Sequence, residues 1–390
     1  MQTCIVNVAI YTEREIIPNG LIVIENDKIA EIHASPVRYK NATIIDGTNL
    51  SAIPGYIDTH CHGGNGFDCN DAELQSVIGM RDFYSKHGIT SFYPSLSANA
   101  IPDTINGLKT IREATQQNRE GRTEICGCHL EGPFLNKTYK GCQAEQYIIP
   151  LNDEHLQLYE TYSDVIKRTT IAPEVERNVD YFPALRKMGI QLSIGHSCAE
   201  YKEIEYAVKQ GATSVTHLYN GMSQTKKVGP FRIGGVLEAG LTLDDLYAEI
   251  IADGYHLPNE LIQIAYRCKG ADKITVCSDA NCAAGGVHGD VIHSCGLTYV
   301  IEQGVVMNSE RTSLASSMTP IDSMVRHLIF NVKLPAFDVV KMASANTAKM
   351  MRIDDRKGSI SVGKDADINL VDNRFNIKMT FCKGVLVDEG

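Results

Sequence analysis

The 390-residue sequence lacks any apolar segment long enough to cross a membrane. No run approaches the roughly 20 apolar residues that a membrane-spanning helix needs. The first ten residues, MQTCIVNVAI, also lack the basic region, the long apolar core and the small-residue cleavage site of a secretory signal. These absences predict a cytoplasmic protein that does not have the membrane as a partner.

Positive charge is also scarce. The 37 Lys and Arg residues are outnumbered by 47 Asp and Glu residues, so the net charge is -10 at pH 7. This balance disfavours nucleic acid and anionic membrane as the main partner. Cysteine is frequent, with twelve residues, but several lie inside apolar runs, such as Cys126, Cys128 and Cys277. Buried free thiols are common in such runs, so we expect a reduced protein without a disulfide framework.

Both ends of the chain consist of short β-like segments. The first 50 residues contain CIVNVAIYT, GLIVIENDKIAEIH and ATIIDG, and Asn26-Asp27 falls where a tight hairpin turn would join two strands. The tail returns to this style with GSISVGKDADINLVD and IKMTFCKGVLVD. We therefore predict a small β domain built from residues 1–52 plus 357–390, and a second domain over residues 53–356.

The middle of the chain alternates apolar runs with segments of helical spacing, such as AEYKEIEYAVKQGA. The apolar runs cover residues 53–58, 89–96, 124–132, 169–174, 190–196, 213–220, 247–254 and 273–280. Eight strands that alternate with helices predict an α/β fold of the (β/α)₈ type, the TIM-type barrel. An open, doubly wound sheet is the alternative.

Histidine and acidic residues follow several of these apolar runs. They stand at the C-terminal ends of the first, third, fifth, sixth and eighth runs: His60, His62, Glu131, His196, His217 and Asp279. In a barrel these ends converge on one mouth, where active sites are built. Residues at i and i+2 of a strand point to the same face, so both histidines of the first run can aim inward.

Imidazole and carboxylate donors suit zinc, iron, manganese or cobalt. A single histidine at a strand end is more often a hydrogen-bonded structural residue than a ligand, and His60 with His62 alone would leave the two interpretations balanced. Four further candidates at the same level of the barrel favour a divalent metal. His129, two residues before Glu131, is better explained by packing or by support of a ligand.

The motifs PGYIDTHCHGG, CHLEGPFLN, SIGHS, VTHLYNGM, IADGYH and SDA occur in this order over nearly the whole chain. In sequence and spacing they closely resemble the N-acetylglucosamine-6-phosphate deacetylases of the amidohydrolase superfamily. HLEGPF and THLYN are quite specific to that family. The resemblance implies a metal-dependent (β/α)₈ barrel, a small β-sandwich domain made from both chain ends, and a homodimer.

The resemblance also implies roles for the residues at the strand ends. Glu131, His196 and His217 match the family's primary metal ligands, and Asp279 matches its general acid/base. His60 and His62 match a pair that some members use for a second metal. One or two divalent metals per subunit are therefore expected, with the glutamate bridging them if two are bound.

Further positions match the family's substrate contacts: Cys142, Gln143, Asn220, Gly221, His256, Leu314, Ala315 and Ser316. One segment departs from the pattern. The family places an arginine after THLYN that reaches the substrate phosphate of a neighbouring subunit, whereas this chain has KKVGPFR. Val228 or Lys227 occupies the expected place, and Lys226, Lys227 or Arg232 could substitute for the arginine. Lysine lacks the bidentate fork of arginine, so selectivity for the phosphate is expected to be weaker.

The predicted function is metal-dependent hydrolysis of the acetamide of N-acetylglucosamine 6-phosphate to glucosamine 6-phosphate and acetate, in the breakdown or recycling of amino sugars. Alternatives are a deacetylase of N-acetylgalactosamine 6-phosphate or of an unphosphorylated N-acyl amino sugar, and a different cyclic amidohydrolase. A barrel retained as a sensor or scaffold is a further alternative. The intact ligand set and Asp279 argue against it, because a scaffold has no physical need for them.

Overall fold

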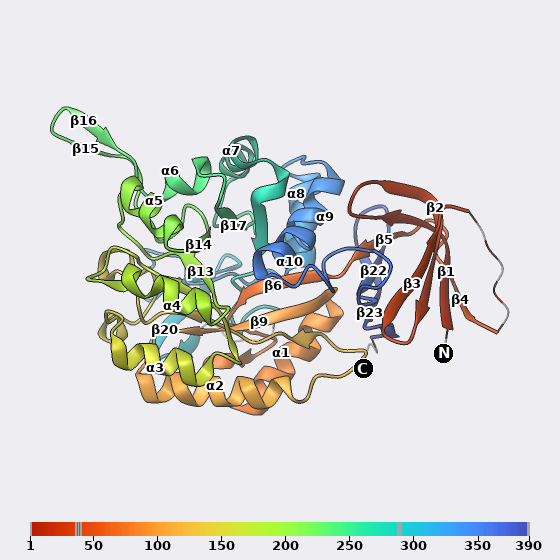
Figure 1. The fold of residues 1–390 in the computed structure, drawn as a ribbon, viewed down its shortest axis with the longest axis horizontal. Helices are drawn as coiled ribbons and strands as arrows, with labels where there is room; N and C mark the ends of the chain where they lie inside the picture. The colour runs from red at the N-terminus through yellow and green to blue at the C-terminus, as the bar shows by residue number, and fades with distance from the viewer. Residues whose placement is uncertain (1, 36, 38, 40, 287–290, 388–390) are drawn as a thin grey trace.

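Two parts make up the molecule, a large barrel and a small sheet beside it (Figure 1). The computed structural model describes all residues except 1, 36, 38, 40, 287–290 and 388–390. Within the described residues, no helix has both the length and the apolar character needed to cross a membrane.

Eight parallel strands form the barrel. In order of pairing they are β6 (Tyr56–Cys61), β9 (Ile89–Ser97), β11 (Cys128–Glu131), β12 (Ile166–Ile171), β13 (Gln191–Ile194), β14 (Ala212–Val215), β17 (Tyr247–Ile251) and β18 (Ile274–Cys277). The short β10 (Glu124–Ile125) adds to β9, and a bridge between Cys61 and Ala280 brings the last strand back to the first. The predicted (β/α)₈ barrel is confirmed, and the open sheet is excluded.

Helices surround the barrel strands, as Figure 1 shows. They are α1 (Leu74–Lys86), α2 (Ile101–Thr115), α3 (Asp153–Tyr162), α4 (Phe182–Lys187), α5 (Tyr201–Lys209), α6 (Val236–Thr242), α7 (Asn259–Lys269), α8 (Ile321–Phe330), α9 (Ala336–Met342) and α10 (Ala345–Met351). The helix predicted in AEYKEIEYAVKQGA is α5. Glu200 and Glu203 cap its start reciprocally, Lys209 lies in its last turn, and Ile204 and Ala207 face the core.

Both chain ends pair into one eight-stranded sheet. Its order is β24-β23-β22-β5-β1-β2-β3, with β4 paired to β1. The strands are β1 (Gln2–Tyr11), β2 (Ile16–Glu25), β3 (Lys28–His33), β4 (Thr43–Asp46), β5 (Ser51–Pro54), β22 (Ile368–Val371), β23 (Ile377–Cys382) and β24 (Val385–Leu386). The hairpin expected at Asn26-Asp27 joins β2 to β3. Buried isoleucines from both chain ends, such as Ile5 and Ile368, form a core separate from that of the barrel.

The first predicted strand, residues 53–58, is divided between the two sheets. Pro54 ends β5 in the small sheet, and Tyr56 begins β6 in the barrel. Gly55 lies between them, and a Cβ atom there would stand 2.2 Å from Thr90 Cγ2. The chain passes too close to β9 for a side chain, and this contact separates the sheets. The limits predicted for the domains, 1–52 plus 357–390 and 53–356, stay predictions.

Three small sheets extend from the barrel. β7 (Gly63–Gly64) pairs with β8 (Phe67–Asp68) directly after β6. β15 (Lys226–Val228) and β16 (Phe231–Ile233) form a hairpin that projects away from the body of the barrel (Figure 1). β19 (Val291–Ser294), β20 (Leu297–Glu302) and β21 (Val305–Asn308) form an antiparallel sheet after β18.

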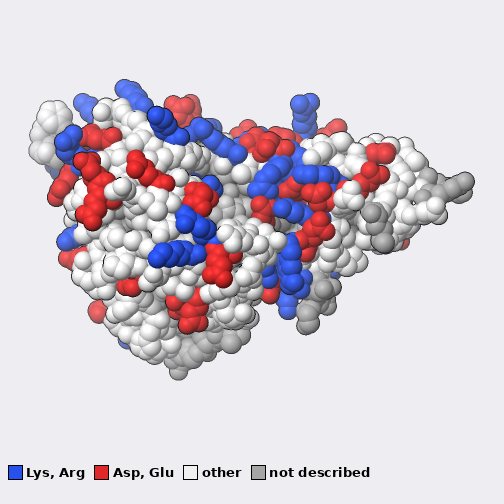
Figure 2. Space-filling view, turned by 60° about the horizontal axis from the view of Figure 1, so that its bottom comes forward, with Lys and Arg blue, Asp and Glu red and all other residues white. Residues whose placement is uncertain are grey.

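Ion pairs join the barrel to the small sheet. Acidic and basic side chains alternate over the narrowing between the two parts (Figure 2). Lys357, whose side chain is 1% exposed, lies 3.1 Å from Glu124 and 2.5 Å from Asp367. Arg356 donates to Glu124 at 2.8 Å. Although burial raises the pKa of Glu124, the charges of Lys357 and Arg356 hold it well below its ordinary value.

We expect Glu124→Gln to lower the free energy of unfolding at pH 7 by about 3–5 kcal/mol, because it leaves a buried lysine with fewer counter-charges. A depressed pKa in the folded protein gives stability that is complete above the ordinary carboxyl pKa, about 4.3. That stability is lost as the pH falls below this value. Urea unfolding between pH 7 and pH 3 should show the difference between variant and wild type shrinking toward acid.

The exposed Glu120 provides the control, and Glu120→Gln should leave the unfolding free energy unchanged across the range. Parallel pH profiles for Glu124→Gln and the wild type would contradict the account.

Candidate active site

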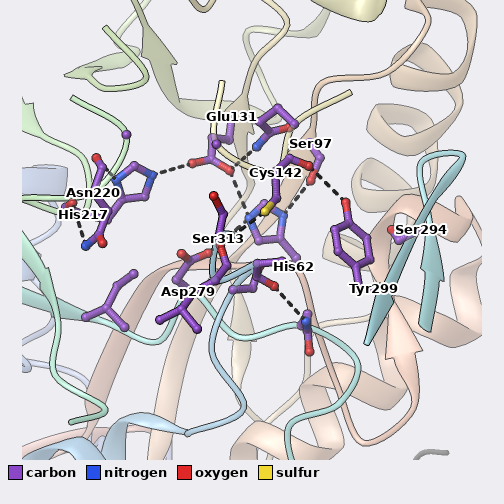
Figure 3. Close-up of a pocket in the computed structure, with 18 of the residues that line it drawn as sticks. His62, Ser97, Glu131, Cys142, His217, Asn220, Asp279, Ser294, Tyr299 and Ser313 are labelled. Carbon is purple, nitrogen blue, oxygen red and sulfur yellow. Dashed lines mark hydrogen bonds and ion pairs between the residues drawn. The ribbon is translucent and has the colours of Figure 1, made fainter. Parts of the chain in front are cut away.

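A cavity of about 350 Å³ opens at the C-terminal ends of the barrel strands. His62, Glu131, His196, His217 and Asp279 line it together, although they come from five different strand ends. Figure 3 shows His62, Glu131, His217 and Asp279 side by side in this cavity. His60 is fully buried and does not line the cavity. The residues predicted at the strand ends are therefore brought to one place.

Glu131, His196 and His217 form one cluster of donor atoms. Glu131 Oε1 lies 3.2 Å from His196 Nε2 and 3.1 Å from His217 Nε2. The two imidazole nitrogens are 3.1 Å apart. All three side chains are almost completely buried.

His60, His62 and Asp279 form a second cluster beside the first. The Nε2 atoms of His60 and His62 are 3.2 Å apart, and each lies 3.4 Å from Asp279 Oδ1. Glu131 connects the clusters, because its Oε1 is 3.3 Å from His60 Nε2 and its Oε2 is 3.1 Å from His62 Nε2. The carboxylate of Glu131 therefore contacts nitrogen atoms of both clusters.

Three of these positions have a left-handed backbone. The φ angles are +47° at His196, +32° at His217 and +45° at Asp279. Residues other than glycine rarely adopt such angles, and each instance costs of order 1–3 kcal/mol. Strain of this kind persists where the surroundings force it, and it clusters at active sites. Here it turns the side chains at the ends of β13, β14 and β18 into the cavity.

In three histidines of the site, a backbone carbonyl oxygen fixes which ring nitrogen carries the proton. Nδ1 of His196 contacts the carbonyl oxygen of Tyr139 at 2.8 Å, and Nδ1 of His217 contacts that of Asn220 at 3.1 Å. Nδ1 of His62 contacts the carbonyl oxygen of Ser95 at 2.8 Å. A carbonyl oxygen only accepts, so each Nδ1 must donate. In the neutral rings the Nε2 lone pairs therefore all face the cavity.

These lone pairs fit a divalent metal. Two Nε2 atoms 3.1–3.2 Å apart cannot both carry protons, and two opposed lone pairs repel each other. A cation between them relieves the repulsion and also satisfies the carboxylates. The donor set of imidazole and carboxylate suits zinc, iron, manganese or cobalt.

Charge is concentrated around Glu131. Burial alone would raise the pKa of Glu131, but the neighbouring His60, His196 and His217 hold it well below its ordinary value. Burial lowers the pKa of His62, yet Asp279 and Glu131 raise it to about 9. The site therefore attracts positive charge strongly, as a metal site does.

A third group, His60, Glu249 and Cys277, also has metal-ligand chemistry. Arg168 already supplies its cation, because Arg168 Nη1 lies 2.5 Å from Glu249 Oε2. All of these side chains are completely buried. This group therefore holds a fixed guanidinium instead of a metal.

Most of the predicted substrate positions surround the clusters. Those that line the cavity are Cys142, Gln143, Asn220, Gly221, His256, Leu314, Ala315 and Ser316. Gln143 donates its amide to Glu131 Oε2 at 2.8 Å, so it also orients that carboxylate. His256 Nδ1 lies 2.7 Å from Asp253 Oδ2, which leaves its Nε2 for a ligand. Burial lowers the pKa of His256, but its hydrogen bond to Asp253 raises it above the ordinary value.

Lys227 does not line the cavity of its own chain. It lies exposed on the β15–β16 hairpin, where Lys226 pairs with Glu200 at 3.0 Å. A contact between Lys227 and substrate therefore stays a prediction that requires a second copy of the chain. His129 contacts the hydroxyls of Ser95 and Thr170, which agrees with the packing role expected for it.

The sequence analysis missed one side of the cavity. Asp68, Asn70, Ser97, Ser294 and Tyr299 line it there, and Figure 3 shows Ser294 and Tyr299 across from Asn220 and His217. Asp68 accepts from the hydroxyl of Ser294 at 2.7 Å. These residues come from β8 and the short 3-10 turn after it, from β9, and from the sheet of β19, β20 and β21. The polar run FDCND was the one available signal.

A (β/α)₈ barrel with imidazole and carboxylate donors at its mouth has the form of a metal-dependent enzyme, and comparison with known proteins identifies its family. The model of the Amidohydrolase family matches residues 51–387. The chain belongs to this family.

Within the family the chain is similar to deacetylases of phosphorylated N-acetyl amino sugars. N-acetylglucosamine-6-phosphate deacetylase from Bacillus subtilis is 31% identical over 384 residues, 97% of this chain and 95% of that protein. The crystal structure of N-acetylglucosamine-6-phosphate deacetylase from Pasteurella multocida superposes with a TM-score of 0.93 at 29% identity and covers 99% of both chains. N-acetylgalactosamine-6-phosphate deacetylase from Escherichia coli O157:H7 is 28% identical over 85% of this chain and 86% of that protein. The family resemblance found in the sequence is confirmed.

We expect His196→Ala and His217→Ala each to lose tightly bound metal, because each removes one of the three donors of the first cluster. Elemental analysis of the purified variants after dialysis measures this. His293→Ala, which alters an exposed histidine on β19, is the control and should keep its metal. Full metal retention in both cluster variants would refute the assignment of the first cluster.

Proposed function

We propose that this chain hydrolyses the acetamide of N-acetylglucosamine 6-phosphate to glucosamine 6-phosphate and acetate. The observation that carries the proposal is the pair of donor clusters joined by Glu131 at the mouth of an amidohydrolase barrel. Relatives named for this activity align over nearly the whole chain.

The two clusters are proposed to hold one or two divalent metals. Glu131, His196 and His217 would hold the first, and His60 and His62 the second. When bound, such a cation polarises the acetyl carbonyl and makes water a better nucleophile. The remaining steps belong to the side chains of the chain itself.

Asp279 is proposed as the general base and acid. Burial raises its pKa, but the neighbouring His60 and His62 hold it below the ordinary value, so the carboxylate is ionised at neutral pH. It lines the cavity beside both clusters and therefore can take a proton from the attacking water. The same proton then passes to the departing amine. A carboxylate has two oxygens, so Oδ1 can stay beside His60 and His62 while the other oxygen accepts the proton.

The sugar is proposed to lie against Asn220, Gly221 and His256. Because Asp253 holds the Nδ1 proton of His256, the Nε2 atom faces the cavity and can donate when the ring is charged. Leu314, Ala315 and Ser316 form the opposite edge of the same cavity.

The substrate phosphate is proposed to require a second copy of the chain. Among the described residues that line the cavity, none is lysine or arginine, whereas Asp68, Glu131 and Asp279 are acidic. A phosphate group placed there without a cation would be repelled. The projecting β15–β16 hairpin exposes Phe231 by 71% and Val228 by 48%, an apolar tip suited to docking on another subunit. We therefore propose a homodimer in which this hairpin brings its cations to the partner's cavity.

A cytoplasmic location is also proposed. All twelve cysteines are free thiols, which agrees with a reducing compartment.

Steady-state kinetics test the function directly. Acetate release from N-acetylglucosamine, N-acetylgalactosamine and their 6-phosphates would be measured with the metal-loaded protein. We expect the highest kcat/KM for N-acetylglucosamine 6-phosphate. The highest value for N-acetylgalactosamine 6-phosphate would favour the activity named for the Escherichia coli relative, and no hydrolysis of any of the four would refute the proposal.

We expect Asp279→Asn to lower kcat by about 10²–10⁴-fold, the usual contribution of general acid–base catalysis. The amide keeps the shape of the side chain but cannot take the proton. The metal content of the first cluster, measured alongside, should be unchanged, and Asp354→Asn at an exposed position is the matched control. Near-normal turnover in Asp279→Asn would mean that another group moves the proton.

For the phosphate, we expect Lys227→Ala to lower kcat/KM on the 6-phosphate by roughly 10- to 150-fold, the value of one charge-assisted hydrogen bond. The value for unphosphorylated N-acetylglucosamine should not change, and neither value should change in Lys209→Ala on the exposed end of α5. The preference should weaken in high salt, because exposed charges are screened.

Mixing variants shows which subunit supplies the cation. A Lys227→Ala chain combined with an inactive Asp279→Asn chain should recover phosphate-dependent activity, because the hybrid has one cavity with both groups. Equal kcat/KM for phosphorylated and plain sugar in the wild type would remove the phosphate from the proposal.

A further inference from the structure

Glu249, on β17, is a completely buried carboxylate that the proposed mechanism does not use. Four donors surround its side chain. Arg168 Nη1 and Thr59 Oγ1 donate to Oε2 at 2.5 and 3.1 Å, whereas His60 Nδ1 and the backbone N–H of His217 lie 3.2 and 3.3 Å from Oε1. Both oxygens are therefore occupied, and Glu249 has no oxygen left for a cation or a substrate.

His60 differs from the other three histidines of the site in its Nδ1 partner. His62, His196 and His217 each contact a backbone carbonyl, whose position is set by the chain. His60 alone contacts a side-chain carboxylate, contributed by a strand 189 residues away in the sequence. Histidine ligands of metals commonly donate their second N–H to such a partner, which sets the tautomer and orientation of the ring.

Arg168 holds this carboxylate in place. Its Nη1 also donates to the carbonyl and hydroxyl of Thr59, and its Nη2 donates to Ser193. The guanidinium is completely buried on β12, so it balances the charge of Glu249 without reaching the cavity. The Arg168–Glu249 pair is therefore bound to β6, the strand that carries His60. The contacts are with the side chains of His60 and Thr59 and with the backbone carbonyl of Thr59.

We infer that Glu249 is a positioning residue: with Arg168 as its support, it keeps the Nδ1 proton of His60 and so directs the Nε2 lone pair to a metal at the second cluster. The inference rests on the proposed function, because it assigns a role within that metal site. It assigns Glu249 to the His60–His62 cluster, because Glu249 contacts the imidazole of His60 but only the backbone N–H of His217.

Two double variants separate this role from simple stabilisation of the barrel. Arg168→Met with Glu249→Leu replaces the ion pair by apolar side chains of similar size, which buried ion pairs often tolerate. Arg168→Met with Glu249→Gln also removes both charges, but it leaves an amide oxygen that can accept from His60 Nδ1 and an amide N–H₂ that can donate to Thr59. The two proteins have the same charge and differ in the hydrogen bonds that residue 249 can make to His60 Nδ1, to the backbone N–H of His217 and to Thr59.

Titration of the metal-free proteins with Co²⁺, followed by visible absorption and by equilibrium dialysis, gives the number of sites and the Kd of each. We expect two sites in the wild type. The Leu double variant should bind its second Co²⁺ about 10- to 100-fold more weakly, the usual effect of removing a partner of a metal-bound histidine. The Gln double variant should stay close to the wild type at both sites. Asp322→Asn, which breaks a comparable carboxylate contact with His87 and Arg326, should change neither site.

Equal Co²⁺ affinities in the Leu and Gln double variants would overturn the inference, as would equal weakening of both sites in the Leu variant. A wild type that binds a single Co²⁺ and hydrolyses the substrate would overturn it as well, while leaving the proposed function intact. A wild type that binds no Co²⁺ would overturn both. If the Leu variant does not fold, ¹⁵N NMR of the metal-free Gln variant tests the inference instead. We expect the proton to remain on Nδ1 of His60. A proton found on Nε2 in place of Nδ1 would overturn the inference.

Discussion

The site depends on one constraint, namely that four imidazole rings present their Nε2 atoms to the same carboxylate. Each ring reaches this orientation because its Nδ1 faces an acceptor: three backbone carbonyls and the carboxylate of Glu249. The acceptors belong to the barrel strands and the loops that follow them, so the frame of the barrel fixes the chemistry at its mouth. Left-handed backbone angles at His196, His217 and Asp279 are part of the same arrangement. The strain they carry is balanced by a core that encloses every strand.

Much of this was predictable from the order of residues along the chain. Eight apolar runs imply eight strands, and parallel strands bring their C-terminal ends together, so His60, Glu131, His196 and Asp279 could be assigned to one mouth before the structure was known. The division of the first run at Gly55 was not predictable, because it depends on the distance between the backbone and Thr90. A close approach of this kind arises only when the two sheets are packed.

Contacts between side chains on distant barrel strands also could not be predicted from the sequence. The contacts of Glu249 with His60 and Arg168 span 189 and 81 residues, and nothing local in YAEIIADG marks the glutamate as different from a surface residue. Asp68 and Tyr299 face one cavity because a loop and an inserted sheet meet there, which periodicity does not reveal. Patterns along a sequence show which face a residue occupies, whereas charge pairing in a barrel interior depends on which strands lie opposite each other.

The small sheet contains the first and last strands of the chain, and this has a consequence for synthesis on the ribosome. β5 can pair with β22 only after more than 300 intervening residues have been synthesised. Likewise, Lys28 can pair with Asp365 only after the 337 residues that separate them along the chain. Until then the strand pairs β1–β2 and β2–β3 can form, but the edge that will accept β22 stays open. Open strand edges recruit other chains, and contacts between distant residues form slowly. The open edge of β5 therefore needs protection from aggregation while the barrel is still being translated.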